Sequence, residues 1–316
     1  MTEIVAVDIG GTHARFALAT IEHGTVTLGP ETVLQTSEQA GFEAAWRAYA
    51  AGIGRDLPNR AAVAIAGPVE SDTIRLTNNH WVLRPTNIAA ELKLTAVELV
   101  NDFAAVAHAV TVCGPEHLAH LCGPEGMLPE AGAISVIGPG TGLGVALLHR
   151  SGTGNRVVAT EGGHIAFAPH DEFEDQLLAR LRARLGRVSV ERVVAGPGLR
   201  EICATLGKDD CLEDKALWMA ALDGSDRVAA EALERFCRSL GSVTGDLALA
   251  HGAGGVVVAG GLGLRLREVL PHSGFTERFT AKGRFRARLA ALPVKLMTHP
   301  QPGLLGAAAS FASRHL

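Results

Sequence analysis

The feature that most constrains the fold is an internal repeat, in which a glycine-threonine turn separates two apolar runs. Residues 5–19 read VAVDIGGTHARFALA and residues 134–148 read ISVIGPGTGLGVALL, with Gly11-Thr12 matching Gly140-Thr141. The β-branched residues before each turn are typical of a buried strand, so each stretch predicts a hairpin. Two such hairpins indicate a duplicated α/β core, with the two turns opposite one another across a ligand-binding cleft.

The composition of the turns indicates what they could hold. Glycine permits positive φ and leaves backbone N–H groups facing outward with no Cβ in the way, which suits a phosphate. Taken alone, the turn Gly10-Gly11-Thr12 is more typical of a hairpin that only reverses the chain. Because the turn occurs twice, the sequence favours the phosphate interpretation.

The rest of the chain alternates predicted strands and helices, with no low-complexity linker. Strands are expected at 61–67, 97–102, 256–263 and 294–297, and the third of these ends in the diglycine Gly260-Gly261. Helices are expected at 38–51, 171–185 and 211–222, from Asp226 onward, and at the C-terminus with Pro302 in the first turn. The Gly- and Pro-containing region 111–132 is the expected boundary between the two halves.

Two other nucleotide-binding motifs are excluded by their spacing. The pair Gly207-Lys208 is followed by Asp209 and lacks the first glycine of a Walker P-loop. Gly138-Pro139-Gly140 has Leu143 where a dinucleotide fingerprint needs its third glycine. The remaining interpretation is a nucleotide held between the two hairpins. Asp8 lies at a strand end, where it could hold Mg²⁺ directly or through water.

Length and charge bound the class of protein. A chain of 316 residues that is 47% hydrophobic can bury a sizeable core and is expected to form two domains. The net charge of −4 gives no reason to expect nucleic acid or a membrane as partner. One local cluster is basic and is expected to form a solvated face rather than a nucleic-acid-binding patch. It comprises Arg278, Lys282, Arg284, Arg286 and Arg288.

The cysteines and the N-terminus predict a cytoplasmic location. Five cysteines without a CxxC pair favour reduced, buried thiols over disulfides or a zinc site. The opening MTEIV has no basic region before its apolar run, and no apolar run reaches membrane-spanning length. The histidines His117 and His120 are expected on a solvated helix face rather than in a ligand site.

Eight motifs in register resemble those of the bacterial glucokinases, which belong to the hexokinase, Hsp70 and actin superfamily. They are DIGGTHAR, LTNNHW, LVNDFAAVAHA, GPGTGLGVA, EGGHIAFAP, SVERVVAGPGL, VVVAGG and QPGLLGAAA. The resemblance implies two similar actin-like, ribonuclease H-like α/β domains around a central cleft. It further implies a small domain of residues 1–112 plus 302–316, a large domain of residues 113–301, and ATP with Mg²⁺ between them.

The activity implied is the ATP-dependent phosphorylation of D-glucose to glucose 6-phosphate, by direct in-line transfer with Asp102 as general base. Asn-Asp at the end of a strand is by itself also a turn signal. A carboxylate in a closed cleft can, however, accept the proton of a sugar hydroxyl during attack on the γ-phosphorus. In the resembling family the matching aspartate acts in this way on the C6 hydroxyl.

The remaining site residues also come from the resemblance. The implied sugar-binding residues are Asn101, Asp102, Glu161, His164 and Glu191. The implied nucleotide-binding residues are Asp8, Ile9, Gly10, Gly11, Thr12, Gly140, Thr141, Gly142, Gly260 and Gly261, and Asp8 is the implied Mg²⁺ ligand. Read without the resemblance, Glu161 and His164 in EGGH fit a surface loop, or a metal pair that lacks a third ligand nearby.

Two departures from the family pattern and three rival functions stay open. The family commonly has an acid where this chain has Ala166 and an asparagine where it has His13. The rivals are a kinase of another hexose or of the ROK group, a sugar-responsive repressor, and a chaperone-like or cytoskeletal ATPase. A homodimer is expected, because it is the commonest assembly of soluble proteins.

Overall fold

A computed structural model describes the whole chain except residues 68, 70, 77–79 and 209–212. The chain divides into two compact units. The first contains Met1–Gly114, Val157–Ala159 and His299–Leu316, and the second contains Pro115–Arg156 and Thr160–Thr298. Three of the residues in the predicted motif LTNNHW, at 77–79, lie outside the described residues, as does Cys211.

A sheet with the strand order β3-β2-β1-β5-β8, in which β4 also pairs with β2, forms the centre of the first unit. The strands are β1 (Thr2–Ile9), β2 (His13–Glu22), β3 (Thr25–Leu28), β4 (Thr32–Gln35), β5 (Arg60–Ile65) and β8 (Ala96–Asn101), with β6 (Ile74–Arg75) and β7 (Val82–Leu83) as a separate pair. The helices are α1 (Phe42–Ile53), α2 (Pro85–Glu91), α3 (Asp102–Val112) and α12 (Pro302–His315), with a 3₁₀ turn η1 (Thr36–Glu38).

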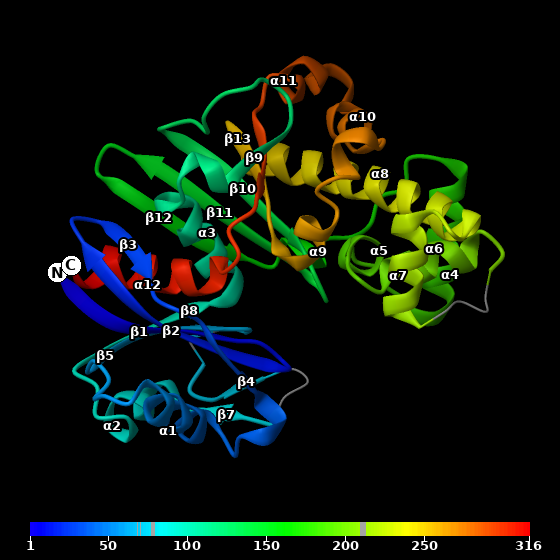
Figure 1. Cartoon of the computed structure of the whole chain (residues 1–316). Coiled ribbons are helices and arrows are strands. Elements are labelled where there is room, and N and C mark those ends of the chain that lie inside the picture. Colours follow the sequence, from blue (N-terminus) through cyan, green and yellow to red (C-terminus); the bar gives the residue numbers. More distant parts are fainter. Residues whose placement is uncertain (68, 70, 77–79, 209–212) are drawn as a thin grey trace. The chain divides into compact units, whose positions relative to one another are not determined.

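The two faces of this sheet are covered by different helices (Figure 1). Successive strand residues point to opposite faces, so Val5 and Val7 pack with α1 while Ile4 and Ala6 pack with α3 and α12. Asp8 belongs to the second set and its carboxylate lies against α12. Burial of Phe311, which is 1% exposed, contributes about 1.5–3 kcal/mol to holding α12 on this face.

A second sheet, with the strand order β12-β11-β10-β13-β14-β9, forms the centre of the second unit. Its strands are β9 (Leu118–Cys122), β10 (Gly132–Pro139), β11 (Leu143–Ser151), β12 (Gly154–Thr160), β13 (Gly255–Val258) and β14 (Val294–Met297). The helices are α4 (Glu172–Leu185), α5 (Glu191–Val194), α6 (Gly198–Thr205), α7 (Asp214–Asp223), α8 (Arg227–Ala250), α9 (Gly260–Arg265), α10 (Phe275–Thr280) and α11 (Arg286–Ala290). Short 3₁₀ turns are η2 (Pro115–His117), η3 (Gly162–His164), η4 (Leu270–His272) and η5 (Gly283–Phe285).

The central strands of the two sheets share one topology, which confirms the predicted duplication of an α/β core. Strand β1 pairs antiparallel with β2 and parallel with β5, and β10 pairs antiparallel with β11 and parallel with β13. The first hairpin turns between Ile9 and Ala14, and the second turns between Pro139 and Leu143. Both predicted glycine-threonine turns therefore connect the antiparallel pair of the repeated core, β1 to β2 in the first unit and β10 to β11 in the second.

Several predicted elements differ from the structure. Strand β13 ends at Val258, and Gly260 begins helix α9, because Gly260 takes a positive φ of 80° that breaks the strand. The predicted helix face at His117 and His120 is wrong, since His117 ends η2 and His120 lies in β9, which pairs with β14.

The basic cluster is only partly solvated, so that prediction was wrong for two of its members. Arg278 is 8% exposed and pairs with Asp171, and the Lys282 side chain is 5% exposed with its Nζ 2.7 Å from Asp246 Oδ1. Cys122, Cys203 and Cys237 are buried, and these and Cys113 are free thiols, as predicted. In the part of the chain that the structure describes, no helix is both long and apolar enough to cross a membrane.

Candidate active site

Polar residues of the first unit meet where its parallel strands end. Ile9 of β1 is in register with Ile65 of β5, and Ile65 with Asn101 of β8. The carboxyl ends of parallel strands share one edge of a sheet, which is the usual place for a ligand in an α/β fold. Asp8, one residue before the end of β1, and Asp102, directly after β8, therefore lie at the same edge.

Asn101 and Asp102 are fixed by the start of helix α3. The Asn101 side chain caps this helix, because its Oδ1 accepts from the backbone N–H groups of Phe103 and Ala104, both at 3.0 Å. Its Nδ2 donates to the carbonyl of Gly67 at 3.3 Å. Asp102 is the first residue of α3, and its Oδ1 accepts from the Phe103 N–H at 2.8 Å. The sequence motif LVND thus ends a strand and caps the next helix.

The electrostatics of Asp8 are unusual for a carboxylate. Burial raises its pKa to about 6, Arg15 opposes this rise, and the charges of Asp102 and Glu31 add to it. The Arg15 Nη1 lies 3.8 Å from Asp8 Oδ2, and the Asp8 side chain is 23% exposed. Ionised Asp8 is therefore only partly neutralised, and a further cation at this position would be favourable.

Two glycines of helix α12 make room for this arrangement. A Cβ on Gly303 would lie 2.5 Å from Asp8 Oδ2. A Cβ on Gly306 would overlap the carbonyl of Ala105 in α3, so α3 and α12 can pack this closely only with glycine there. The motif QPGLLGAAA therefore supports both strand-end carboxylates from the far end of the sequence.

The first glycine turn is held by a residue that the sequence did not indicate. The Gly10 N–H donates to the His13 carbonyl at 2.9 Å. Thr36 donates its N–H to the Thr12 carbonyl at 2.9 Å and its Oγ1 hydroxyl to the Gly11 carbonyl at 3.0 Å. No motif marks Thr36, because its position beside the turn depends on the pairing of β4 with β2.

The second glycine turn is held by Glu191. The Gly140 N–H donates to the Gly142 carbonyl at 2.8 Å, and the Leu143 N–H donates to Glu191 Oε2 at 2.9 Å. A Cβ on Gly142 would lie 2.6 Å from that oxygen, so any larger residue there would displace the Glu191 carboxylate from the turn. Gly260 lies close to the end of β10, since a Cβ added to it would lie 2.8 Å from the Pro139 carbonyl oxygen. A Cβ added to Gly261 would face open space.

Glu161 and His164 are neighbours on a short 3₁₀ turn. His164 Nε2 lies 3.7 Å from Glu161 Oε2, and the two side chains are 59% and 86% exposed. The turn packs on β11, because a Cβ on Gly162 would lie 2.8 Å from the Val145 side chain. Arg187 donates to the His164 carbonyl at 2.6 Å and holds the turn from its other side.

The structure thus gathers the predicted site residues into two groups, one in each unit. Asp8, Ile9, Gly10, Gly11, Thr12, Asn101 and Asp102 lie in the first, and Gly140, Thr141, Gly142, Glu161, His164, Glu191, Gly260 and Gly261 lie in the second. Ala166 forms a bridge with Ser189 beside the second group, and His13 begins β2 beside the first.

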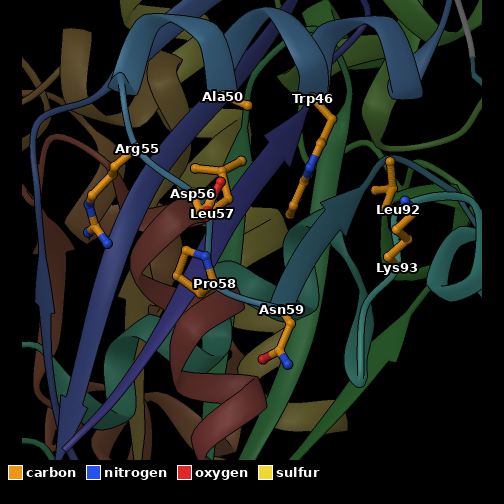
Figure 2. Close-up of a pocket in the computed structure, with 9 residues that line it drawn as sticks. All are labelled: Trp46, Ala50, Arg55, Asp56, Leu57, Pro58, Asn59, Leu92 and Lys93. Carbon is orange, nitrogen blue, oxygen red and sulfur yellow. The ribbon is translucent and has the colours of Figure 1, made fainter.

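A separate hollow of about 440 Å³ in the first unit contains none of these residues (Figure 2). It is lined by Trp46 and Ala50 of α1, by residues 55–59 and by Leu92 and Lys93. It lies at the amino ends of β5 and β8, at the opposite end of these strands from Asn101. Its Arg55 is paired with Glu3, with Nη2 2.5 Å from Oε1.

Comparisons with known proteins agree over nearly the full length. A protein-family model described as Glucokinase matches residues 5–314. A glucokinase of Zymomonas mobilis is 52% identical over 99% of this chain and 98% of its own length. A glucokinase of Paramagnetospirillum magneticum is 42% identical over 98% of this chain and 97% of its own.

Solved structures show the same likeness. The crystal structure of a glucokinase from an Antarctic psychrotroph matches with a TM-score of 0.87 at 33% identity, over 99% of both chains. A ROK family glucokinase from Streptomyces griseus in complex with glucose and AMPPNP matches with a TM-score of 0.66, over 97% of this chain and 98% of its own. At 22% identity this match shows a similarity of fold alone.

Proposed function

This chain belongs to the glucokinase family, and from that premise we propose that Asp102 is the general base in its ATP-dependent phosphorylation of D-glucose to glucose 6-phosphate. The observation that carries the proposal is the position of Asp102 at the strand-end edge that also holds Asp8. Asp102 accepts the proton of the C6 hydroxyl as that oxygen attacks the γ-phosphorus. The bond from the γ-phosphorus to the β,γ-bridging oxygen breaks, and ADP leaves in line with the attack.

The two glycine turns hold the phosphates of ATP. The N–H groups of Gly10 and Gly140 close the turns themselves. The N–H groups of Gly11 and Thr12 in the first turn, and of Thr141 and Gly142 in the second, bind phosphate oxygens without the mobility of a side chain. Thr36 and Glu191 keep these turns in one conformation through the hydrogen bonds described above. Ile9 leads into the first turn, and Gly260 and Gly261 line the nucleotide beside the second.

Asp8 fits a role as the protein's Mg²⁺ ligand, directly or through water. Mg²⁺ is commonly held by one or two carboxylates together with substrate phosphates. The pKa of Asp8 is raised by burial and by two neighbouring acids, which is the environment in which a divalent cation most favours the ionised form. When bound, Mg²⁺ neutralises charge that develops on the transferred phosphoryl group.

The sugar is held by Asn101, Glu161, His164 and Glu191 together with Asp102. Carboxylates and imidazole nitrogens can accept hydrogen bonds from adjacent sugar hydroxyls. Glu161 and His164 already lie 3.7 Å apart on one turn, a spacing that lets each take a neighbouring hydroxyl. A missing or inverted hydroxyl would leave one acceptor unpaired, at a cost of about 1–3 kcal/mol, which gives the site its specificity.

The assembly and location stay predictions. We expect a homodimer in the cytoplasm, in which residues 1–112 plus 302–316 and residues 113–301 act as small and large domains. Light scattering after size exclusion measures the assembly, and a monomer would contradict it.

The decisive test is Asp102→Asn, because asparagine keeps an acceptor for the Phe103 N–H but is too weak a base to take a proton. We expect kcat to fall by about 10²–10⁴ while the Kd for glucose changes by less than about tenfold, since a base acts mainly in the transition state. Near-normal kcat would end the assignment of Asp102. The activity is measured as ADP release with glucose, mannose, fructose, galactose, N-acetylglucosamine and no sugar.

A further inference from the structure

One short segment of the second unit, residues 188–196, contacts both the proposed sugar-binding turn and the proposed phosphate-binding turn. Its first residues pair with the chain that follows Glu161 and His164. The Phe167 N–H donates to the Val188 carbonyl at 3.0 Å, and the Val190 N–H donates to the Ile165 carbonyl at 2.9 Å. The start of the segment is therefore fixed to the sugar-binding turn.

The later residues of the same segment hold the phosphate-binding turn at two points. Glu191 Oε2 accepts from the Leu143 N–H at 2.9 Å, and the Gly196 N–H donates to the Gly140 carbonyl at 2.8 Å. Trp218 fixes this end of the segment, because its indole Nε1–H donates to the Gly196 carbonyl at 3.1 Å. The turn is thus clamped on both sides by residues 191–196.

The carboxylate of Glu191 has two oxygens with different surroundings. Oε2 is used by the turn, while among the described residues no hydrogen bond is made to Oε1. The residue is partly exposed, so Oε1 can accept from a ligand hydroxyl. Gly142 lets the carboxylate approach the turn, since any Cβ there would displace Oε2.

We propose that Glu191 couples the two substrates, with one oxygen on the nucleotide-binding turn and the other on a sugar hydroxyl. This inference rests on the proposed function of Glu191 as a sugar ligand. A sugar hydroxyl on Oε1 restrains the carboxylate and thereby orders the turn before ATP arrives, and ATP on the turn orders Glu191 for the sugar. Each substrate then raises the affinity for the other by the same factor, as linkage requires.

The experiment is calorimetric titration of glucose into the full chain, with and without saturating Mg²⁺ and AMPPNP. The ratio of the two glucose Kd values is the coupling factor, which we expect to be about fivefold or more in the wild type. Glu191→Gln leaves one acceptor oxygen for two donors, so the ratio should fall toward one and glucose should bind more weakly. Glu161→Gln is the matched control, because it should also weaken glucose binding. The Glu161 side chain lies beside His164, and among the described residues no hydrogen bond joins it to the phosphate-binding turn, so the wild-type ratio should persist.

The remaining outcomes separate this inference from the proposed function. Glucose binding that is weakened in Glu191→Gln with an unchanged ratio would overturn the coupling but keep Glu191 as a sugar ligand. Unchanged glucose affinity would remove Glu191 from the sugar site itself. A wild-type ratio of one, or a ratio lost equally in Glu161→Gln, would also overturn the coupling. Should Glu191→Gln fail to fold, Gly142→Ala is the second variant, because its Cβ displaces the same carboxylate from the turn. If Gly142→Ala kept the same ratio of glucose Kd values as the wild type, the inference would be refuted.

Discussion

Replacing Asp8 with asparagine should stabilise the first unit at neutral pH while it impairs catalysis. Burial is the main reason that the pKa of Asp8 rises from 3.8 to about 6, and its side chain is only 23% exposed. Each pKa unit corresponds to about 1.4 kcal/mol, so ionised Asp8 costs the folded state about 3 kcal/mol relative to the unfolded chain. Asparagine carries no charge and avoids this cost.

The sign of the effect fixes its pH window. Because the folded pKa lies above the unfolded value, protonated Asp8 contributes stability that is fully present below about pH 4 and is lost as pH rises through about 6. The free energy of unfolding of Asp8→Asn minus that of the wild type should therefore increase by about 3 kcal/mol between pH 4 and pH 8. Functional carboxylates are commonly held at such a cost in stability.

The assay is urea unfolding of the first unit at several pH values. A Trp218→Phe background leaves Trp46 and Trp81, both in the first unit, as the fluorescent reporters, so the second unit does not contribute. The reasoning is refuted if the wild type and Asp8→Asn lose or gain stability in parallel across this range. A free-energy difference between Asp8→Asn and the wild type that shrinks as the pH rises from 4 to 8 would contradict the assigned direction of the pKa shift.

Three further results are expected. Glu161→Ala should raise the glucose KM with little change in the ATP KM, and an unchanged glucose KM would remove Glu161 from the site. Arg278→Met leaves buried Glu174 and nearby Asp171 without the cation that pairs with them, so it should lower the free energy of unfolding by about 3–5 kcal/mol. Arg288→Met, in the exposed part of the same basic cluster, is the control and should change the free energy of unfolding by less than about 0.5 kcal/mol. Gly306→Ala should cost about 1–3 kcal/mol in urea unfolding because its Cβ overlaps the Ala105 carbonyl; equal stability would mean that α12 and α3 can separate freely.

Much of the fold could be predicted because the signals are local. The β-branched runs and glycine turns predicted both hairpins, and Asp226 predicted the start of α8, which it caps. The repeat predicted a duplicated core because two copies of a pattern fold by the same rules. Gly260 was the local exception: the apolar run suggested a continued strand, but the close approach of the Pro139 carbonyl required a residue that could adopt positive φ.

The site could be predicted as a set of residues but not as a set of contacts. Local patterns indicated Asp8 and Asp102, which lie at strand ends, and the resemblance to the glucokinases indicated Glu191. They gave no sign that Thr36 supports the first turn, because that contact depends on where β4 pairs. Nor did they show that Glu191 holds the second turn, since Glu191 and Leu143 are far apart in the sequence.

Local pattern and backbone conformation were enough to predict the two hairpins, several of the strands and helices, the duplicated core and the residue types available for phosphate and sugar chemistry. The environment of each charge, by contrast, depends on contacts between distant parts of the chain. Arg278 and Lys282 look like solvated residues in the sequence, yet they are buried because α10 packs on α8 at Gly241 and Gly245. The pKa of Asp8 likewise depends on α12, Arg15 and Asp102, which only folding brings to the end of β1.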